Sequence, residues 1–117
     1  MNFKLRNGIE MPNIGFGTSL IEGEECVNNI KQALQAGYRH IDTASAYKNE
    51  IYIGQAIKES KLPREEIFIT SKVWKDSMGY ENTIKSFNNS LQNLGLDYID
   101  LFLIHWPRNN DKQLNID

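Results

Sequence analysis

The chain has 117 residues, which suits one small domain with a buried core and leaves no room for two. Its 13 basic and 15 acidic side chains give a net charge of −2, and no concentrated basic stretch predicts binding to nucleic acid or to a membrane surface. The single cysteine, Cys26, cannot form an internal disulfide, and no segment resembles a signal peptide or a transmembrane helix, so we expect a cytoplasmic protein.

The first elements are a hairpin, a short strand and a helix. Asn7-Gly8 lies between two short apolar runs and predicts the turn of a β-hairpin, because both residues tolerate positive φ. A short strand is expected at residues 14–17. The acidic residues at 22–25 then suit the start of a helix, which Gly37 ends. The apolar stripe of this helix consists of Val27, Ile30, Ala33 and Leu34.

Two more helices alternate with three more strands. A short strand ends at Asp42, and a second helical stripe stops before Pro63. An apolar, β-branched strand is expected at residues 67–74, and the most apolar strand at 98–106. Between them, Gly95 closes a third helix. The two later stripes consist of Ile53, Ala56 and Ile57, and of Ile84, Phe87, Leu91 and Leu94.

The predicted strands recur about every 30 residues, enough for one strand, one helix and two short loops. Such alternation predicts parallel strands joined by right-handed helical crossovers. An open doubly wound sheet and a (β/α)8 barrel are both built in this way. The pattern of strands and helices does not choose between them.

The polar residues at the strand ends favour the barrel. A dinucleotide-binding sheet needs G-x-G-x-x-G after its first strand, but Leu20 occupies the place of the third glycine. A barrel instead places polar side chains at the carboxyl ends of successive strands. Four consecutive strand ends carry such residues, and Tyr47 follows in the loop after the second. They are Thr18, Asp42, Lys72 and His105.

Several motifs, in the same order, resemble the aldo-keto reductase family. The similarity runs from residue 3 to about residue 107, and includes the hairpin and Gly15-Phe16-Gly17-Thr18. The other matching segments are Gly37-Tyr38-Arg39-His40-Ile41-Asp42-Thr43-Ala44 with Tyr47, Asn49 and Glu50, then Ile69-Thr70-Ser71-Lys72-Val73-Trp74, and Asp97-Tyr98-Ile99-Asp100-Leu101 leading into Leu103-Ile104-His105-Trp106-Pro107.

The resemblance implies an α/β fold: a partial (β/α)8 TIM barrel with an N-terminal β-hairpin, about four parallel strands and three helices. Residues 1–117 would form the N-terminal portion of the barrel, truncated after its fourth strand. The implied activity is reduction of small aldehydes or ketones with a nicotinamide cofactor, NADPH or, as the alternative, NADH. Self-association through exposed barrel edges is expected if the chain is truncated.

The same resemblance makes Asp42, Tyr47, Lys72 and His105 the catalytic tetrad. Reduction of a carbonyl needs a hydride on carbon and a proton on oxygen, and Tyr47 would supply the proton. Lys72 would favour the phenolate, because an adjacent ammonium stabilises it, and Asp42 would keep that lysine charged. His105 would donate a hydrogen bond to the carbonyl oxygen and orient it.

Further contacts are predicted around the tetrad. Gly17, Thr18 and Asp42 are expected to bind the cofactor. Trp74 and Trp106 would form apolar walls beside the substrate or would simply pack in the fold. In the family, the later strands of the barrel supply most contacts to the cofactor.

The residues agree less well with other classes of protein. His40 and Asp42 share one strand face and, with His105, suggest a metal-dependent barrel hydrolase, but no second cluster of ligands supports that class, and no metal is expected. A short-chain dehydrogenase needs Tyr and Lys four residues apart, which this chain lacks. The remaining alternative is a non-catalytic fragment that acts by self-association or complementation, since a complete barrel needs about 250 residues.

Overall fold

The computed structural model describes residues 1–107, which form an N-terminal hairpin and a helix-flanked parallel sheet. The hairpin pairs β1 (Asn2–Lys4) with β2 (Glu10–Pro12) around the predicted turn. The strands of the sheet are β3 (Phe16–Gly17), β4 (His40–Asp42), β5 (Phe68–Val73) and β6 (Leu101–Ile104). The helices are α1 (Gly23–Gln35), α2 (Glu50–Ser60) and α3 (Tyr80–Leu94), with the short 3-10 turns η1 (Ser45–Tyr47), η2 (Arg64–Glu66) and η3 (Lys75–Ser77).

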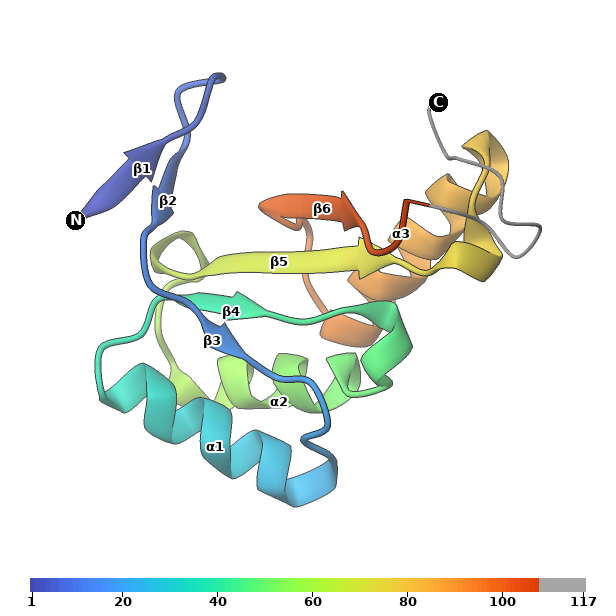
Figure 1. The fold of residues 1–117 in the computed structure, drawn as a ribbon. Coiled ribbons are helices and arrows are strands. Elements are labelled where there is room, and N and C mark those ends of the chain that lie inside the picture. Colours follow the sequence, from blue (N-terminus) through green and yellow to red (C-terminus); the bar gives the residue numbers. More distant parts are fainter. Residues whose placement is uncertain (108–117) are drawn as a thin grey trace.

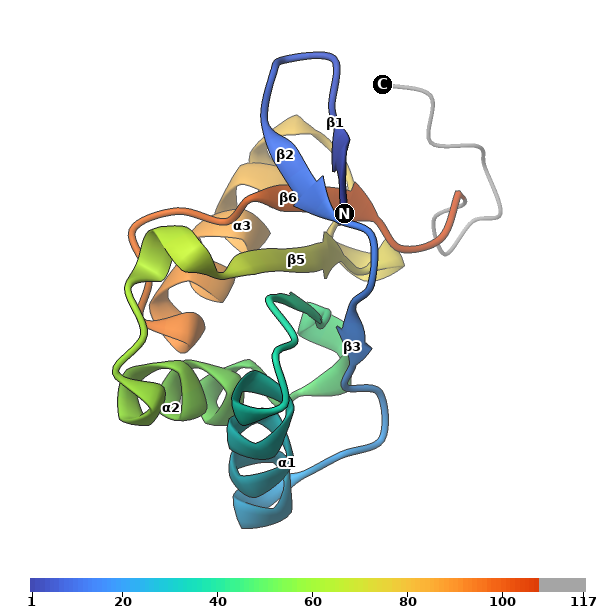
Figure 2. The ribbon, with the colours of Figure 1, turned by 90° about the vertical axis from the view of Figure 1, so that its left-hand side faces the viewer.

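The order of the strands decides between the two architectures that the sequence left open. The sheet runs β3-β4-β5-β6, and every neighbouring pair is parallel. Each crossover therefore steps in the same direction, whereas a doubly wound sheet reverses its order at a switch point. Helices α1 and α2 lie on one side of the sheet, and the hairpin lies on the other, near the starts of β4 and β5 (Figures 1 and 2). This arrangement is the partial (β/α)8 barrel predicted from the sequence.

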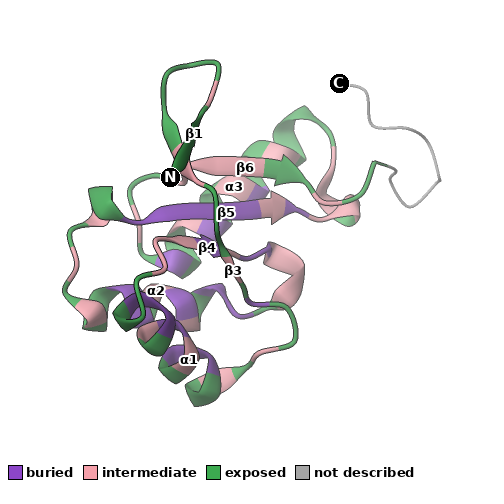
Figure 3. Cartoon of the chain, turned by 60° about the vertical axis from the view of Figure 1, so that its left-hand side comes forward, coloured by how far each residue is buried: buried purple, intermediate pink, exposed green. Residues whose placement is uncertain are grey.

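The core lies between the sheet and its helices. Alternate strand residues, such as Ile41 and Ile69, face α1 and α2 and are fully buried. The predicted stripe of α1 is buried along its whole length, and so is that of α2 (Figure 3). Each fully buried Ile or Val contributes about 1.5–3 kcal/mol to folding. The opposite face of the sheet carries the polar side chains discussed below.

Helix α3 departs from its predicted packing. Its buried residues are Ser86, Ser90 and Leu94, whereas Ile84 is 46% exposed. Phe87 is half-buried, and its ring packs edge-on against Phe102 of β6, with centroids 5.2 Å apart. The stripe of α3 is thus buried at its C-terminal end, where Leu94 joins the core, and exposed at Ile84, while Ser86 and Ser90 are buried as well.

Three predicted strands are shorter than expected, and β5 (68–73 instead of 67–74) differs least. β6 covers residues 101–104 instead of 98–106, and β3 covers residues 16–17 instead of 14–17. The segment before β6 is held by Arg64, which donates to the carbonyl oxygen of Tyr98 at 2.9 Å and to Asp100 Oδ2 at 2.7 Å. The backbone N–H of Asp100 still donates to the carbonyl oxygen of Ile69 at 3.0 Å, and the side-chain contacts of Arg64 hold the segment beside it. Among residues 1–107, no helix has the length and hydropathy needed to span a membrane.

Gly54 of α2 sets the distance between α2 and α3. A Cβ at this position would lie 2.2 Å from the carbonyl oxygen of Leu94, so the two helices could not keep their present separation. We expect Gly54→Ala to lower the free energy of unfolding by about 2 kcal/mol or more, as forced overpacking does. Urea unfolding of the variant would measure this loss. Lys58→Ala, on the exposed side of the same helix, is the control and should change stability by less than about 0.5 kcal/mol.

Candidate functional site

An ion pair joins the carboxyl ends of β4 and β5. Lys72 Nζ donates to both carboxylate oxygens of Asp42 at 2.9 Å and to the carbonyl oxygen of Thr43 at 2.8 Å. The side chain of Lys72 is only 14% exposed and that of Asp42 is 35% exposed. Because all three ammonium hydrogens have acceptors, the lysine head is fixed in position, and the carboxylate compensates for its lost hydration.

Tyr47 lies beside this ion pair. It is the last residue of η1, which is tied to β5 by a hydrogen bond from Ser45 Oγ to the carbonyl oxygen of Lys72 at 3.1 Å. Lys72 Nζ lies 5.1 Å from the centre of the Tyr47 ring. The structure therefore brings the predicted phenol next to the predicted cation, within the range of cation–π attraction.

His105 completes the cluster from the end of β6. Its backbone N–H donates to the carbonyl oxygen of Val73 at 3.2 Å, which continues the β5–β6 ladder by one residue. Its ring makes an edge contact with Tyr47, with centroids 5.5 Å apart, and another with Trp74 at 5.2 Å. All four predicted tetrad residues thus lie in one cluster at the carboxyl end of the sheet.

The surroundings of His105 favour the neutral ring. Burial lowers the pKa of His105, the Lys72 ammonium lowers it further, and the Asp42 carboxylate opposes both. Nδ1 is buried and has no hydrogen-bond partner in the described part of the chain. A buried N–H without an acceptor is costly, so the tautomer with its proton on Nε2 is favoured. That proton is available for donation to a bound oxygen.

The two tryptophans differ in how much they are covered. Trp74 is half-buried and packs against both His105 and Trp106, whose ring centroid lies 4.8 Å from its own. Trp106 is 50% exposed. Trp74 thus both packs in the fold and borders the cluster, and Trp106 extends this border outward. Their contact with a substrate stays a prediction.

The predicted cofactor contacts lie beside Asp42. Thr18 is fully buried, and both its backbone N–H and its Oγ1 donate to the carbonyl oxygen of Asp42, at 3.1 and 2.9 Å. Its side chain therefore supports the end of β4. Gly17 is exposed, and a Cβ there would meet no atom within 4 Å. The contact of Gly17, Thr18 and Asp42 with a cofactor remains a prediction.

Asn49 and Glu50 support the strand ends, although the sequence alone predicted no role for them. Asn49 is fully buried: its amide donates to the carbonyl oxygens of Thr18 at 2.7 Å and Ile21 at 3.0 Å, and it accepts from Thr43 Oγ1 at 2.8 Å. The next residue, Glu50, accepts from Ser71 Oγ at 2.8 Å. Both residues start α2, and their burial links this helix to the strand ends. A polar pair at a helix start predicts an exposed cap. The sequence signal for these two residues is therefore their place in the family motif.

The histidine that suggested a metal site lies elsewhere. His40 Nε2 is 2.8 Å from Thr70 Oγ1, and its ring packs against Phe68 with centroids 4.9 Å apart. Within residues 1–107, no group of three or more His, Cys, Asp or Glu side chains is placed to hold a metal ion. The arrangement around Asp42 is thus an ion pair with lysine.

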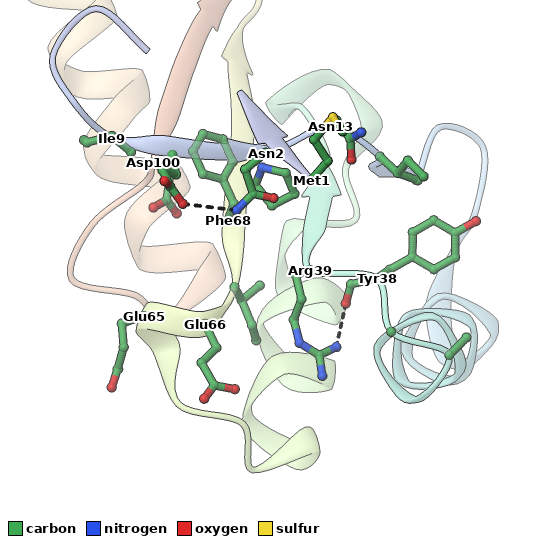
Figure 4. Close-up of a pocket in the computed structure, with 16 residues that line it drawn as sticks. Met1, Asn2, Ile9, Asn13, Tyr38, Arg39, Glu65, Glu66, Phe68 and Asp100 are labelled. Atoms are coloured by element: carbon green, nitrogen blue, oxygen red, sulfur yellow. Dashed lines mark hydrogen bonds between the residues drawn. The ribbon is translucent and has the colours of Figure 1, made fainter. Parts of the chain in front are cut away.

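A separate cavity of about 660 Å³ opens at the other end of the strands, between the hairpin and the starts of β4 and β5 (Figure 4). Its lining includes Arg39, Glu65, Glu66 and Phe68, and none of the tetrad residues. One terminal nitrogen of Arg39 donates hydrogen bonds to the carbonyl oxygens of Leu34 and Tyr38, at 2.8 and 2.7 Å. The cluster at the carboxyl end remains the better candidate for chemistry.

Comparisons with known proteins agree with this geometry. A sequence model described as the Aldo/keto reductase family matches residues 13–116. The "Glyoxal reductase" of Bacillus subtilis is 55% identical over 105 residues, which cover 89% of this chain and 38% of that protein. An aldo-keto reductase from a Medee basin deep-sea metagenome library superimposes with a TM-score of 0.89 at 55% identity, over 94% of this chain and 40% of that one. A Bombyx mori aldo-keto reductase in complex with NADP gives a TM-score of 0.86 at 35% identity, over 97% and 41%.

The chain therefore spans about two fifths of the length of these relatives. The related structures are (β/α)8 barrels, and the sheet β3–β6 with its helices corresponds to part of such a barrel.

The charges around His105 make its titration a direct test of the cluster. We expect its pKa to lie below the usual value of 6.5, because burial and Lys72 disfavour the imidazolium. Lys72→Met removes the cation and should raise this pKa, whereas Asp42→Asn removes the carboxylate and should lower it further. NMR titration of the ring protons measures both shifts. Lys58→Met, a surface variant on α2, should leave the titration unchanged, and opposite or absent shifts for the first two variants would contradict the arrangement.

Proposed function

Since the chain belongs to the aldo/keto reductase family, we propose that it carries the catalytic tetrad of a nicotinamide-dependent carbonyl reductase. The proposed reaction reduces a small aldehyde or ketone to an alcohol, with NADPH as the preferred donor. The observation that carries the proposal is the cluster itself. A cation held by a carboxylate lies 5.1 Å from a phenol ring, and a neutral imidazole lies at the edge of that ring.

The residues have separate tasks in this proposal. Tyr47 donates its phenolic proton to the oxygen of the substrate as that oxygen gains charge. Lys72 stabilises the phenolate that remains, because it is a fixed ammonium beside the ring. Asp42 holds the ammonium through both carboxylate oxygens. Lys72 needs no movement to act in this way, because its three acceptors already hold the ammonium beside the ring.

His105 orients the substrate in the proposal. A neutral ring with its proton on Nε2 can donate a hydrogen bond to the carbonyl oxygen without competing with Tyr47 as an acid. The edge contacts with Tyr47 and Trp74 fix the plane of the ring. Trp74 and Trp106 then offer an apolar border that suits a small carbonyl compound.

The residues beside Asp42 fit a nicotinamide cofactor. The Asp42 carboxylate is 35% exposed although it is paired, and the exposed backbone of Gly17 has open space where a Cβ would lie. Gly17, Thr18 and Asp42 would contact the cofactor, which supplies the hydride when bound. The Bombyx mori relative described with NADP supports this choice of cofactor.

The proposed setting is the cytoplasm. Cys26 is a free thiol, and burial raises its pKa, so it stays protonated and unreactive inside the core. A reducing compartment suits a chain whose only cysteine is used for packing.

Replacing the phenol tests the proposal most directly. Because the chain covers 38% of the Bacillus subtilis glyoxal reductase, it can replace the matching segment in a chimera. In that chimera we expect Tyr47→Phe to lower kcat for NADPH-dependent reduction of glyoxal by about 10²–10⁴-fold, the usual contribution of a general acid. Consumption of NADPH measures the rate.

The matched control is Tyr52→Phe, since Tyr52 lies on α2 and packs against the core. It should keep the rate within about twofold. A Tyr47→Phe chimera that folds and retains the full rate would refute the role of Tyr47, and circular dichroism would show whether each variant is folded.

A further inference from the structure

The side chain of Asn49 is fully buried and binds two different loops. Its Nδ2 donates to the carbonyl oxygens of Thr18 at 2.7 Å and Ile21 at 3.0 Å, in the loop between β3 and α1. Its Oδ1 accepts a hydrogen bond from Thr43 Oγ1 at 2.8 Å, in the loop after β4. Both loops lie at the carboxyl end of the sheet (Figure 1). The amide therefore uses both of its donor hydrogens on one loop and its acceptor on the other.

The loop bound by the amide nitrogen contains a strained turn. The backbone N–H of Ile21 donates to the carbonyl oxygen of Thr18 at 3.3 Å and closes a turn in which Leu20 has a φ of 65°. This left-handed conformation is unfavourable for a residue with a Cβ, and glycine usually adopts it. The Leu20 side chain is 95% exposed, so its own packing does not compensate for the strain. The turn is held instead by the packing of Ile21 against the core and by the two hydrogen bonds from Asn49.

The acceptor side of Asn49 leads to Lys72. Thr43, whose hydroxyl donates to the amide, offers its carbonyl oxygen to Lys72 Nζ at 2.8 Å. Asp42, the preceding residue, binds the same ammonium through both carboxylate oxygens at 2.9 Å. The network closes at Thr18, whose N–H and Oγ1 both donate to the carbonyl oxygen of Asp42. The turn, the amide and the ion pair are thus joined in one ring of hydrogen bonds, and the members of such a network affect one another.

We propose that Asn49 is a positioning residue that couples the turn of residues 18–21 to the Lys72 ammonium. Gly17 and Thr18 are the proposed contacts to the cofactor, and Lys72 is the proposed support of the phenolate. Asn49 would therefore keep these two parts of the site in a fixed relation, because its planar amide bonds to both. The catalytic consequence rests on the proposed function, whereas the coupling between the turn and Lys72 does not.

Two substitutions separate the two sides of the amide. Asn49→Asp removes both donors to the turn but leaves an oxygen that can accept from Thr43. Thr43→Val keeps the shape of the residue and both bonds to the turn, but removes the hydrogen bond to Asn49. Both would be made in the chimera with Bacillus subtilis glyoxal reductase. Without coupling, the first would raise only the KM for NADPH and the second would lower only kcat.

With coupling, each substitution also affects the distant side. We expect Asn49→Asp to lower kcat for glyoxal about tenfold or more, and Thr43→Val to raise the KM for NADPH about threefold or more. Adding Leu20→Gly to Asn49→Asp should return both constants to within about threefold of the parent chimera, because glycine adopts the left-handed φ without support. Asn89→Asp is the control, since it makes the same chemical change at an exposed position of α3, and it should leave both constants unchanged.

Hydrogen exchange measures the coupling without turnover. The amide of Ile21 closes the turn, so its exchange rate reports how often the turn opens. Thr43→Val should speed this exchange about threefold or more, although it removes no bond of the turn itself. Asn89→Asp should leave the rate unchanged. Thr43→Val is a conservative change, so it decides the question even if circular dichroism shows that Asn49→Asp does not fold.

Three outcomes would overturn the inference. They are an unchanged Ile21 exchange rate in folded Thr43→Val, variants that each change only the constant of their own side, and a Leu20→Gly substitution that restores neither constant. A chimera that shows the faster Ile21 exchange but reduces no glyoxal would support the coupling and refute the proposed function.

Discussion

The ion pair between Lys72 and Asp42 is the interaction on which the arrangement of the site depends. It connects two neighbouring parallel strands at their carboxyl ends, and its third hydrogen bond, to the backbone of Thr43, fixes the start of the loop that leads to Tyr47. A partly buried charge pair of this kind does little for stability by itself, because desolvation offsets much of the attraction. Its value is positional: it holds a cation in one place, beside a phenol and a histidine.

The sheet makes this convergence possible. In a parallel sheet, each helical crossover brings the chain back to the starting end of the sheet. All strands therefore run in the same direction, and their carboxyl ends lie together at one end of the sheet. Asp42, Lys72 and His105 come from three such ends. Asp42 lies opposite Thr70 and Lys72 lies opposite Leu103, so Lys72 and His105 each lie two residues further along than the register partner of the preceding residue. Thr18 supports the same edge from β3, through two hydrogen bonds to the backbone of Asp42. Residues that are far apart in the sequence therefore lie close together once the sheet has formed.

This regularity explains how much could be predicted from the sequence. Helices α1 and α2 were predicted from apolar periodicity, and the clustering of Asp42, Tyr47, Lys72 and His105 was predicted from polar residues at strand ends together with the family motif. Periodicity could not choose between a barrel and a doubly wound sheet, because strand order is a property of tertiary structure. It also could not reveal that Asn49 and Glu50 are buried, since polar residues at a helix start usually face water.

The packing of α3 agrees with its predicted stripe only in part, for a physical reason. Apolar spacing identifies the face of a helix that avoids water, but it does not identify the surface that covers this face. In α1 that surface is the sheet of the same chain, and prediction and structure agree. In α3 only Leu94, at the C-terminal end of the stripe, is buried in the core, whereas Ile84 is exposed and Ser86 and Ser90 are buried. Periodicity therefore located the stripe, whereas its burial at Leu94 and its exposure at Ile84 depend on which elements lie beside each turn of α3.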